Sequence, residues 1–180
     1  MEHTFFGCLG YELDLKHLLT LERRQISEQV VFYKKYRKIF QFGEFRRLKN
    51  GWQVSADGVT AAGVFHKLMN AAPGYEQLRL IGLDAGKTYH LRTRAQKIRV
   101  GQFAHLLKHV APVNINPDGA VLRTADKHYG LEDGVEGYHV SGAALLSGIL
   151  LQPRFRGTGY DTRQRTQSDY GSNLYIIEEE

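Results

Sequence analysis

The chain has 180 residues, of which 42% are hydrophobic and 24% are charged, and its formal net charge is +5 at pH 7. This composition supports a packed core and excludes an intrinsically disordered chain, and the sequence has neither a run of about 18 apolar residues nor the pattern of a signal peptide. The basic residues are spread along the chain without zinc-ligand spacing or an RNA-binding aromatic-glycine signature, so a nucleic-acid-binding protein is not predicted.

The first predicted element is "TFFGCLGYELDL" at residues 4–15, in which Phe5, Phe6, Cys8 and Leu9 leave no polar face. A short apolar run bounded by glycines predicts a strand buried on both sides, although the pattern leaves a buried helix segment open. Such strands belong to parallel sheets covered by helices, so we interpret this one as part of something larger. The single cysteine is expected to be a buried spectator rather than a catalytic thiol, and it indicates a cytoplasmic protein.

An amphipathic helix is predicted at Thr20–Phe42. Its apolar residues at helical spacing are Ile26, Val30, Tyr33 and Phe40. We expect Thr20 to cap the N-terminus and Gly43 to follow the C-terminus. The strand and this helix together form one βα unit, which lacks the rest of its sheet.

After Gly43 the pattern changes to short segments rich in β-branched and aromatic residues. The predicted strands are "EFRRL", "WQVSA", "VTAAGVFHKL", "QLRLIGL" and "TYHLRTR", which begin at residues 44, 52, 59, 77 and 88. Turn sequences such as Asn50-Gly51 and Asp57-Gly58 separate them. This spacing is typical of an antiparallel sandwich, so we place a domain boundary at residue 43.

The second half of the chain is less regular. Its predicted features are a short helix or strand at 103–110, a turn at 116–119, a polar loop at 126–137 and two apolar stretches at 143–151 and 173–177. A loop rich in Gly, Arg and Thr separates the two apolar stretches. We favour a tight corner between two strands there, with a ligand-touching loop as the alternative.

Two groups of polar residues are candidates for chemistry. His105 and His109 have the spacing of two metal ligands on a helix, but the glutamate of the zinc-protease pattern and a third ligand are missing, so no metal site is predicted. The carboxylates expected in loops are Asp126, Glu132, Asp133, Glu136, Asp161 and Asp169. Loop carboxylates usually face water, so the residues alone identify no catalytic pair.

Four stretches in order carry a resemblance: "FFGCLGYELDL", "EQVVFYKKYRKIFQFGEFRRL", "RLIGLDAGKTYHL" and "GTGYDTRQRTQSDYGSNLYII". Together they look like the C-terminal third of bacterial α-galactosidases of glycoside hydrolase family 36. The resemblance covers essentially the whole chain, and residues 103–138 look most like the versions found in lactobacilli. It implies a mainly β fold in which residues 44–180 form an antiparallel β-sandwich. Residues 1–43 would be the last strand and helix of a (β/α)8 barrel. The sandwich would cover the side of that barrel and bury its apolar groups through residues such as Phe45, Leu48 and Trp52.

The resemblance also implies a parent enzyme that removes terminal α-linked galactose from melibiose- or raffinose-type sugars by a retaining mechanism. That mechanism uses two aspartates and no metal or organic cofactor. No residue of this chain matches either aspartate, so no catalytic residue is assigned. We therefore expect the isolated chain to be mainly structural and inactive.

Barrel active sites lie at the C-terminal ends of the strands, so Phe6, Gly7 and Cys8 are the nearest candidates for substrate contact. The implied partners are the catalytic barrel, the α-galactosides of the parent and further copies in a homo-oligomer, commonly a tetramer. The alternative is a carbohydrate-binding β-sandwich with exposed aromatic residues. The candidates for that role are Trp52, Tyr75, Tyr89, Tyr129 and Tyr138.

Overall fold

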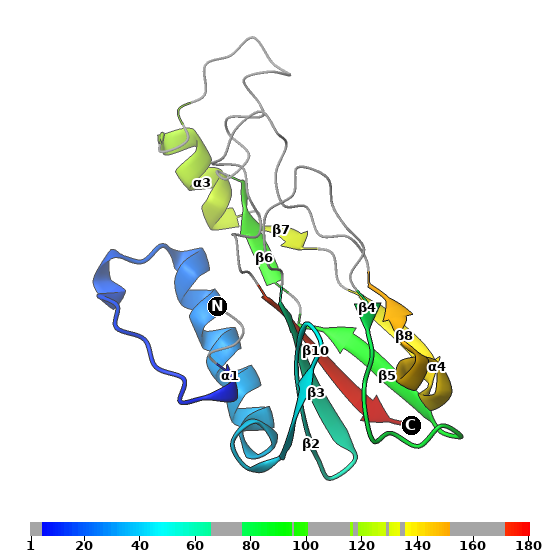
Figure 1. Ribbon diagram of the computed structural model, residues 1–180. Helices are drawn as coiled ribbons and strands as arrows, with labels where there is room; N and C mark the ends of the chain where they lie inside the picture. The colour runs from blue at the N-terminus through cyan, green and yellow to red at the C-terminus, as the bar shows by residue number, and fades with distance from the viewer. Residues whose placement is uncertain are drawn as a thin grey trace.

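A computed structural model describes residues 5–65, 77–94, 96–100, 116, 119–128, 130–133, 136–151 and 172–180. The helices are η2 (Leu15–His17), α1 (Thr20–Phe42), α3 (Ala120–His128) and α4 (Gly142–Ser147). The strands are β1 (Glu44–Leu48), β2 (Gly51–Ala56), β3 (Val59–Phe65), β4 (Gln77–Leu78), β5 (Thr88–Thr93), β6 (Gln96–Arg99), β7 (Gly130–Asp133), β8 (Gly137–Ser141), β9 (Ile149–Leu150) and β10 (Ser172–Glu179). Figure 1 shows the main sheet with α1 along one side and β4 and α4 on the other.

Six strands form one antiparallel sheet in the order β1-β2-β3-β10-β5-β8. Strands β1 to β3 follow one another as a meander. The C-terminal strand β10 then enters between β3 and β5, where Ile177 lies opposite Thr60 on one side and Leu91 on the other. The sheet is therefore complete only when the end of the chain has joined strands that lie far earlier in the sequence.

Alternate residues of β10 serve two separate cores. Leu174 and Ile176 pack on the side of α1 with Tyr33 and Phe40, while Tyr175 and Ile177 pack on the side of β4, β9 and α4. Six consecutive residues of β10 are buried as a result. A strand covered on both faces has no polar side, which explains the continuous apolar run in its sequence.

The predicted mainly β fold with an antiparallel sheet is confirmed. The predicted helix at Thr20–Phe42 has these same bounds, and strands lie at or near 44–48, 52–56, 59–65 and 88–93 as expected. The second layer of the sandwich is small, because it consists of the two-stranded β4–β9 sheet and α4. No helix in the described part of the chain is long and apolar enough to cross a membrane.

The ends of α1 differ from the prediction. Leu19, rather than Thr20, is the N-cap residue, and its N–H donates to Glu22 Oε2 at 2.8 Å. The glutamate in the first turn thus takes the place of the predicted threonine cap. At the other end, Gly43 has φ of −71°, outside the left-handed region. Glycine is needed there because a Cβ would lie 2.6 Å from Val54 Cγ1.

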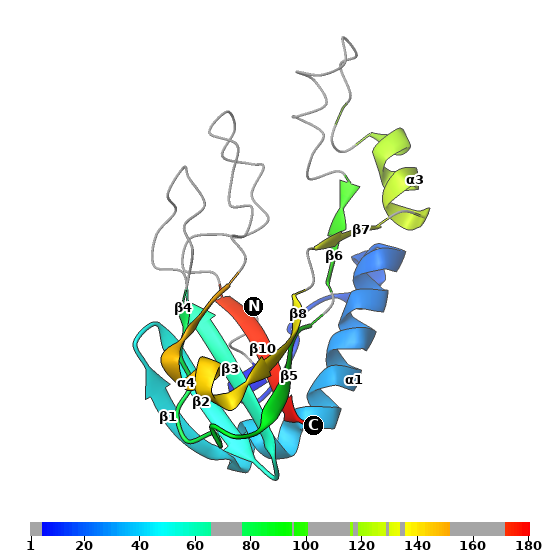
Figure 2. The same cartoon turned by 90° about the vertical axis from the view of Figure 1, so that its right-hand side faces the viewer.

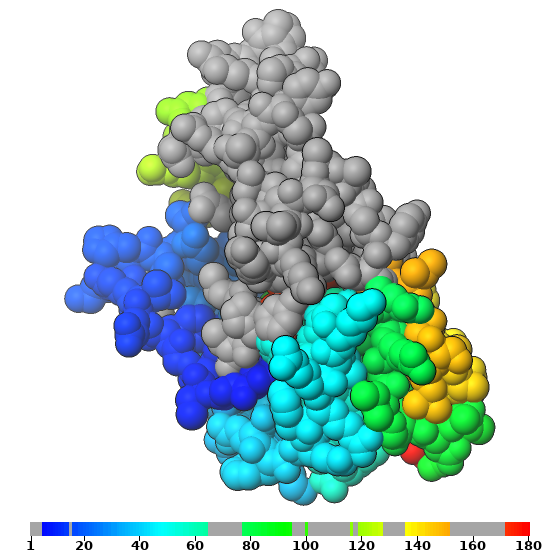
Figure 3. All heavy atoms as spheres, in the orientation of Figure 1, coloured from blue at the N-terminus to red at the C-terminus, as the bar shows by residue number. Residues whose placement is uncertain are grey.

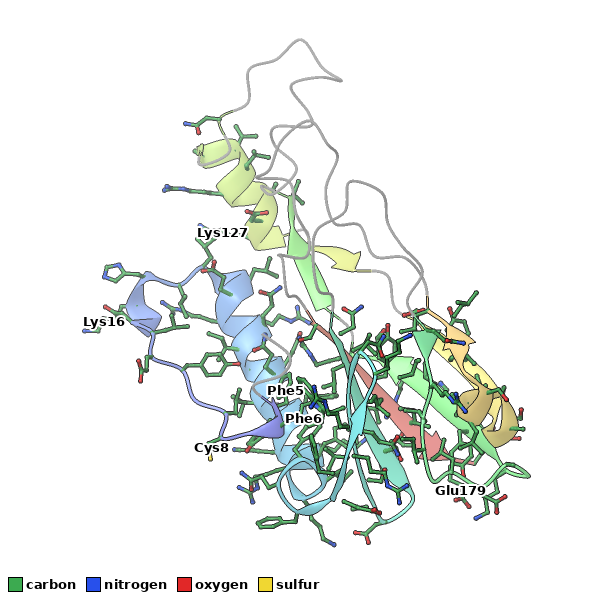
Figure 4. All side chains as sticks on the ribbon, in the orientation of Figure 1. Phe5, Phe6, Cys8, Lys16, Lys127 and Glu179 are labelled. Carbon is green, nitrogen blue, oxygen red and sulfur yellow. The ribbon has the colours of Figure 1, made fainter. Side chains whose placement is uncertain are left out.

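The predicted N-terminal strand does not form in the described chain. Phe5 and Phe6 lie in a 3-10 turn, and no described strand pairs with the segment that follows. A strand exists only where a neighbouring strand accepts its backbone hydrogen bonds, so the strand of the expected barrel unit is not confirmed. Cys8, expected to be buried, is exposed, and Figure 4 shows its side chain pointing away from the molecule.

The polar loop predicted at 126–137 is also wrong. Instead, α3 ends at His128, β7 pairs with β6, and β8 begins at Gly137. Leu122 and Asp126 lie four residues apart on α3 and are both buried, which gives the short helix one inward face. The predicted strand from residue 77 is a strand only at Gln77–Leu78. The element predicted at 103–110 and most of the glycine-rich loop lie outside the described residues.

The turn between β2 and β3 forms as predicted. Asp57 and Gly58 have φ of 53° and 77°, the signature of the type I′ turn that suits a two-residue hairpin. Lys38 of α1 donates to Asp57 Oδ2 at 2.8 Å, and this hydrogen bond, followed by the lysine charge, holds the pKa of Asp57 below its ordinary value. The helix is thereby tied to the tip of the hairpin.

The close approach of β2 and β3 at Gly51 allows a direct test of the pairing between these two strands. A Cβ on Gly51 would lie 1.8 Å from the Gly63 carbonyl oxygen, so the two strands would have to separate. We expect Gly51→Ala to lower the free energy of unfolding by about 3 kcal/mol, measured by urea denaturation followed through Trp52 fluorescence. Gly10→Ala is the matched control, because a Cβ there meets nothing within 4 Å. Equal stability of the two variants would contradict the described strand pairing.

Candidate functional site

The predicted substrate-contact residues Phe6, Gly7 and Cys8 belong to the N-terminal segment, which Figure 3 shows in dark blue. Figure 4 labels Phe6 and Cys8 beside the C-terminal half of α1. The Phe6 ring packs edge-on against Trp52 with 4.9 Å between centroids. The Gly7 carbonyl oxygen accepts a hydrogen bond of 3.0 Å from the Tyr33 hydroxyl. Two of the three residues are therefore held by contacts inside the chain, and their contact with a substrate stays a prediction.

A polar cluster, which we call the α1–β10 clamp, joins Tyr36 of α1, Glu178 of β10 and Arg92 of β5. Arg92 Nη2 donates to Glu178 Oε2 at 2.7 Å and to the Tyr36 hydroxyl at 2.8 Å. That hydroxyl donates to Glu178 Oε1 at 3.1 Å. Lys35 Nζ lies 3.8 Å from the same carboxylate. Both carboxylate oxygens are thus engaged in holding the helix against the sheet.

A groove of about 650 Å³ runs beside this clamp between α1 and strand β5. Val31, Phe32 and Ile176 provide its apolar lining, and Lys35 and Arg92 stand at its polar side. This volume and mixture are within the range of small-molecule sites. Arg92 already binds Tyr36 and Glu178, however, so the groove's polar side is part of the link between helix and sheet.

Glu136 is a buried carboxylate, although the sequence predicted it in a loop that faces water. Only 1% of its surface is exposed, and its two oxygens accept hydrogen bonds from the Tyr175 hydroxyl at 2.9 Å and the Tyr138 hydroxyl at 3.3 Å. The expectation that Glu136 faces water in a loop is therefore wrong. Its partners come from β8 and β10, so no local sequence signal could have revealed them. The Glu136 carboxylate thereby ties the start of β8 to β10.

Within the described residues, no group of three or more His, Cys, Asp or Glu is placed to hold a metal ion. His105 and His109 lie outside the described residues. His90 and His139 stack on neighbouring strands with 4.8 Å between ring centroids, and His139 Nδ1 lies 2.5 Å from Glu180 Oε1. The two imidazoles therefore stack across the paired strands β5 and β8.

The aromatic residues proposed for sugar stacking are mostly occupied. Tyr89 is 4% exposed, Tyr138 is partly buried against the core, and Trp52 packs on Phe6. Tyr75 and Tyr129 lie outside the described residues. All three described candidates have contacts inside the domain, so the carbohydrate-binding alternative gains no support from them.

Two of the exposed large apolar side chains lie at the junction of α1 and β1. Phe42 is 80% exposed and Phe45 is 64% exposed, and Val31 on the middle of α1 is exposed as well. Large exposed apolar groups of this kind often mark a surface that another domain covers.

Comparison with known proteins gives a family match. Residues 51–177 match the model of the glycosyl hydrolase family 36 C-terminal domain. The chain is 37% identical over 94 residues to alpha-galactosidase AgaA of Geobacillus stearothermophilus, and the match covers 47% of this chain and 13% of that protein. It is 35% identical over 99 residues to alpha-galactosidase 1 of Pediococcus pentosaceus, with 49% and 14% covered. The chain therefore matches only a small part of the length of these relatives.

Solved structures show the same fold. An alpha-galactosidase from Lactobacillus brevis is similar with a TM-score of 0.60 and 23% identity, over 98% of this chain and 19% of that one. A variant of AgaA from Geobacillus stearothermophilus, solved in complex with raffinose, is similar with a TM-score of 0.59 and 22% identity, over 98% and 18%. The likeness in fold extends beyond the 51–177 match and includes α1.

The α1–β10 clamp predicts an energetic coupling between Tyr36 and Glu178. We expect Tyr36→Phe and Glu178→Gln each to lower the free energy of unfolding by about 1 kcal/mol, with a coupling of about 0.5–1 kcal/mol in the double variant. Urea unfolding of the four proteins measures it. The control pair is Lys87→Met with Glu179→Gln, whose ion pair is more exposed and should show no measurable coupling. Strict additivity at Tyr36 and Glu178 would show that the clamp does not link helix to sheet.

Proposed function

This chain belongs to the glycosyl hydrolase family 36 C-terminal domain family, and from this premise we propose that it works as the C-terminal part of an α-galactosidase. The observation that carries the proposal is the family match over residues 51–177. The curated relatives named alpha-galactosidase, at 35–37% identity, add support for the activity of the parent. The fold likeness over 98% of the chain supports including residues before the family match.

The proposed parent removes terminal α-linked galactose from melibiose- or raffinose-type sugars and retains the anomeric configuration. One aspartate attacks the anomeric carbon and forms a galactosyl-enzyme, while the other protonates the departing oxygen and then activates water. The two carboxylates of such a site stand about 5–5.5 Å apart. Neither matches a residue of this chain, and Glu136 and Glu178 are engaged in internal contacts. We therefore propose that the isolated chain does not hydrolyse galactosides.

The proposed role of this chain in the parent is structural. Residues 1–43 would supply the last strand and helix of the catalytic barrel, and residues 44–180 the sandwich packed against it. Tyr36 supports this arrangement because it ties α1 to the sheet through Glu178. The exposed Phe42 and Phe45 suit a surface that the barrel covers. Within such a barrel the first segment would gain neighbouring strands, which is the condition it lacks for β structure.

Two expected barrel contacts need correction. Leu48 is 7% exposed and packs in the core that the main sheet shares with β4, β9 and α4. Trp52 is partly buried against Phe6. Both residues stabilise the domain itself. Of the three residues expected to pack against apolar groups of the barrel, only Phe45 therefore has an exposed side chain. We still propose that Phe6, Gly7 and Cys8 are the residues of this chain that come nearest to the substrate.

We further propose a cytoplasmic location and a homo-oligomeric parent. A single cysteine cannot form a disulfide within this chain, and this suits a reducing compartment. The family resemblance supports the oligomer.

Immunocapture from the source cells tests the proposed function. Antibody raised to this chain should remove α-galactosidase activity from a lysate of cells grown on melibiose, and the activity should reappear on the beads, measured with nitrophenyl α-galactoside. β-Galactosidase activity, which should remain in the supernatant, is the control for non-specific loss. Antibody that captures the protein but leaves α-galactosidase activity in the supernatant would reject the proposal. The purified 180-residue chain should release no nitrophenol above a buffer blank.

A further inference from the structure

The groove between α1 and the main sheet has the dimensions of a small-molecule site. Figure 2 shows α1 running beside β10 and β5, and the groove of about 650 Å³ lies between the helix and these strands. Its lining extends from Ser27 to Tyr36 along the helix, and from His90 to Arg94 along β5 and the residue that follows it. At about 1.5 Å per helical residue and 3.3 Å per strand residue, both walls are about 13 Å long. This length suits a molecule of two aromatic ring systems or a chain of similar size.

One wall of the groove is apolar. Val31 is 66% exposed, and Phe32 and Ile176 line the groove beside it. Val31 and Lys35 are four residues apart on α1, so they lie on the same face of the helix. A ligand in the groove therefore meets apolar surface and positive charge next to each other.

The two described carboxylates in the lining are engaged with other partners. Glu136 accepts hydrogen bonds from Tyr138 and Tyr175, which pack in the core on the opposite side of the main sheet. Its carboxylate therefore lies toward that core and away from α1. Glu28 forms an ion pair of 3.0 Å with Arg24, one turn earlier on the helix. Both negative charges are thus held outside the space that a ligand would occupy.

The cations of the groove keep hydrogen-bond donors for a ligand. Lys35 Nζ lies 3.8 Å from the Glu178 carboxylate, which is beyond hydrogen-bond distance. Arg92 donates to Glu178 and Tyr36 through Nη2, so these bonds leave the N–H groups on Nε and Nη1 unused. The Lys35 and Arg92 side chains are 60% and 38% exposed, and Arg94 lines the groove as a third cation. Because the clamp already fixes Arg92, a ligand would lose little free energy in ordering it.

We propose that this groove binds an amphipathic organic anion. The apolar body of the ligand packs against Val31, Phe32 and Ile176. Its carboxylate or sulfonate accepts charge-assisted hydrogen bonds from Lys35 and Arg92. A neutral apolar molecule would leave the cations unused, and a small inorganic anion would leave the apolar wall in water. The proposed site uses only the described groove and is independent of the proposed function.

Fluorescence titration of the full chain with anilinonaphthalene sulfonate tests the proposal. This probe combines aromatic rings with one sulfonate, and its emission rises when it leaves water. We expect saturable binding of one probe per chain. Phenylnaphthylamine is the matched ligand because it has the same rings without the sulfonate, and we expect it to bind about tenfold more weakly. Equal affinity for the two ligands would overturn the assignment of an anion site.

Two neighbouring lysines provide the matched variants for the charge. Lys34 and Lys35 are both exposed on α1, but only Lys35 is among the described residues that line the groove. We expect Lys35→Gln to weaken binding of the sulfonate about tenfold, and Lys34→Gln to weaken it less than about twofold. Equal effects of the two substitutions would indicate attraction by overall charge and would overturn the site.

Two exposed valines provide the matched variants for the apolar wall. Val31 lines the groove, whereas Val121 lies on α3 and is 76% exposed. We expect Val31→Asn to weaken binding of both ligands about fivefold, and Val121→Asn to leave it unchanged. Circular dichroism checks that both variants are folded. Unchanged binding to folded Val31→Asn would place the probe on another apolar surface, such as that of Phe42, and would contradict the proposal.

Discussion

The insertion of β10 between β3 and β5 holds the helix, the main sheet and the small second layer in place. This strand pairs with both neighbours, and its alternating side chains complete the two cores. Its Glu178 also supplies the carboxylate to which Tyr36 and Arg92 bind, so the same strand fixes the position of α1. The helix, the main sheet and the small second layer are therefore held together by the last residues of the chain.

The elements that the sequence predicted well are those whose signals are local. The bounds of α1 follow from helical periodicity, and the hairpin at Asp57-Gly58 follows from turn residues that adopt positive φ. Apolar patterning likewise indicated a strand near 173–177. It did not indicate that this strand is central, because the order of strands depends on contacts between distant parts of the chain.

The failures have the same physical origin. The predicted strand at residues 4–15 needed neighbours that the described chain does not provide, and Cys8 is exposed as a result. Glu136 looked like a loop carboxylate, yet tyrosines of two strands enclose it. The proposed function therefore rests on family membership. The polar groups that converge at the α1–β10 clamp hold the helix on the sheet.

If this chain is one part of a longer α-galactosidase, as we propose, the native protein must be much larger than the chain. An immunoblot of the source cells with antibody to the chain measures that size, since a barrel alone adds about 250 residues. We expect one band far above the 20.5 kDa of this chain. A band at 20.5 kDa alone would contradict it, because the chain would then exist without the catalytic part to which its function is attributed.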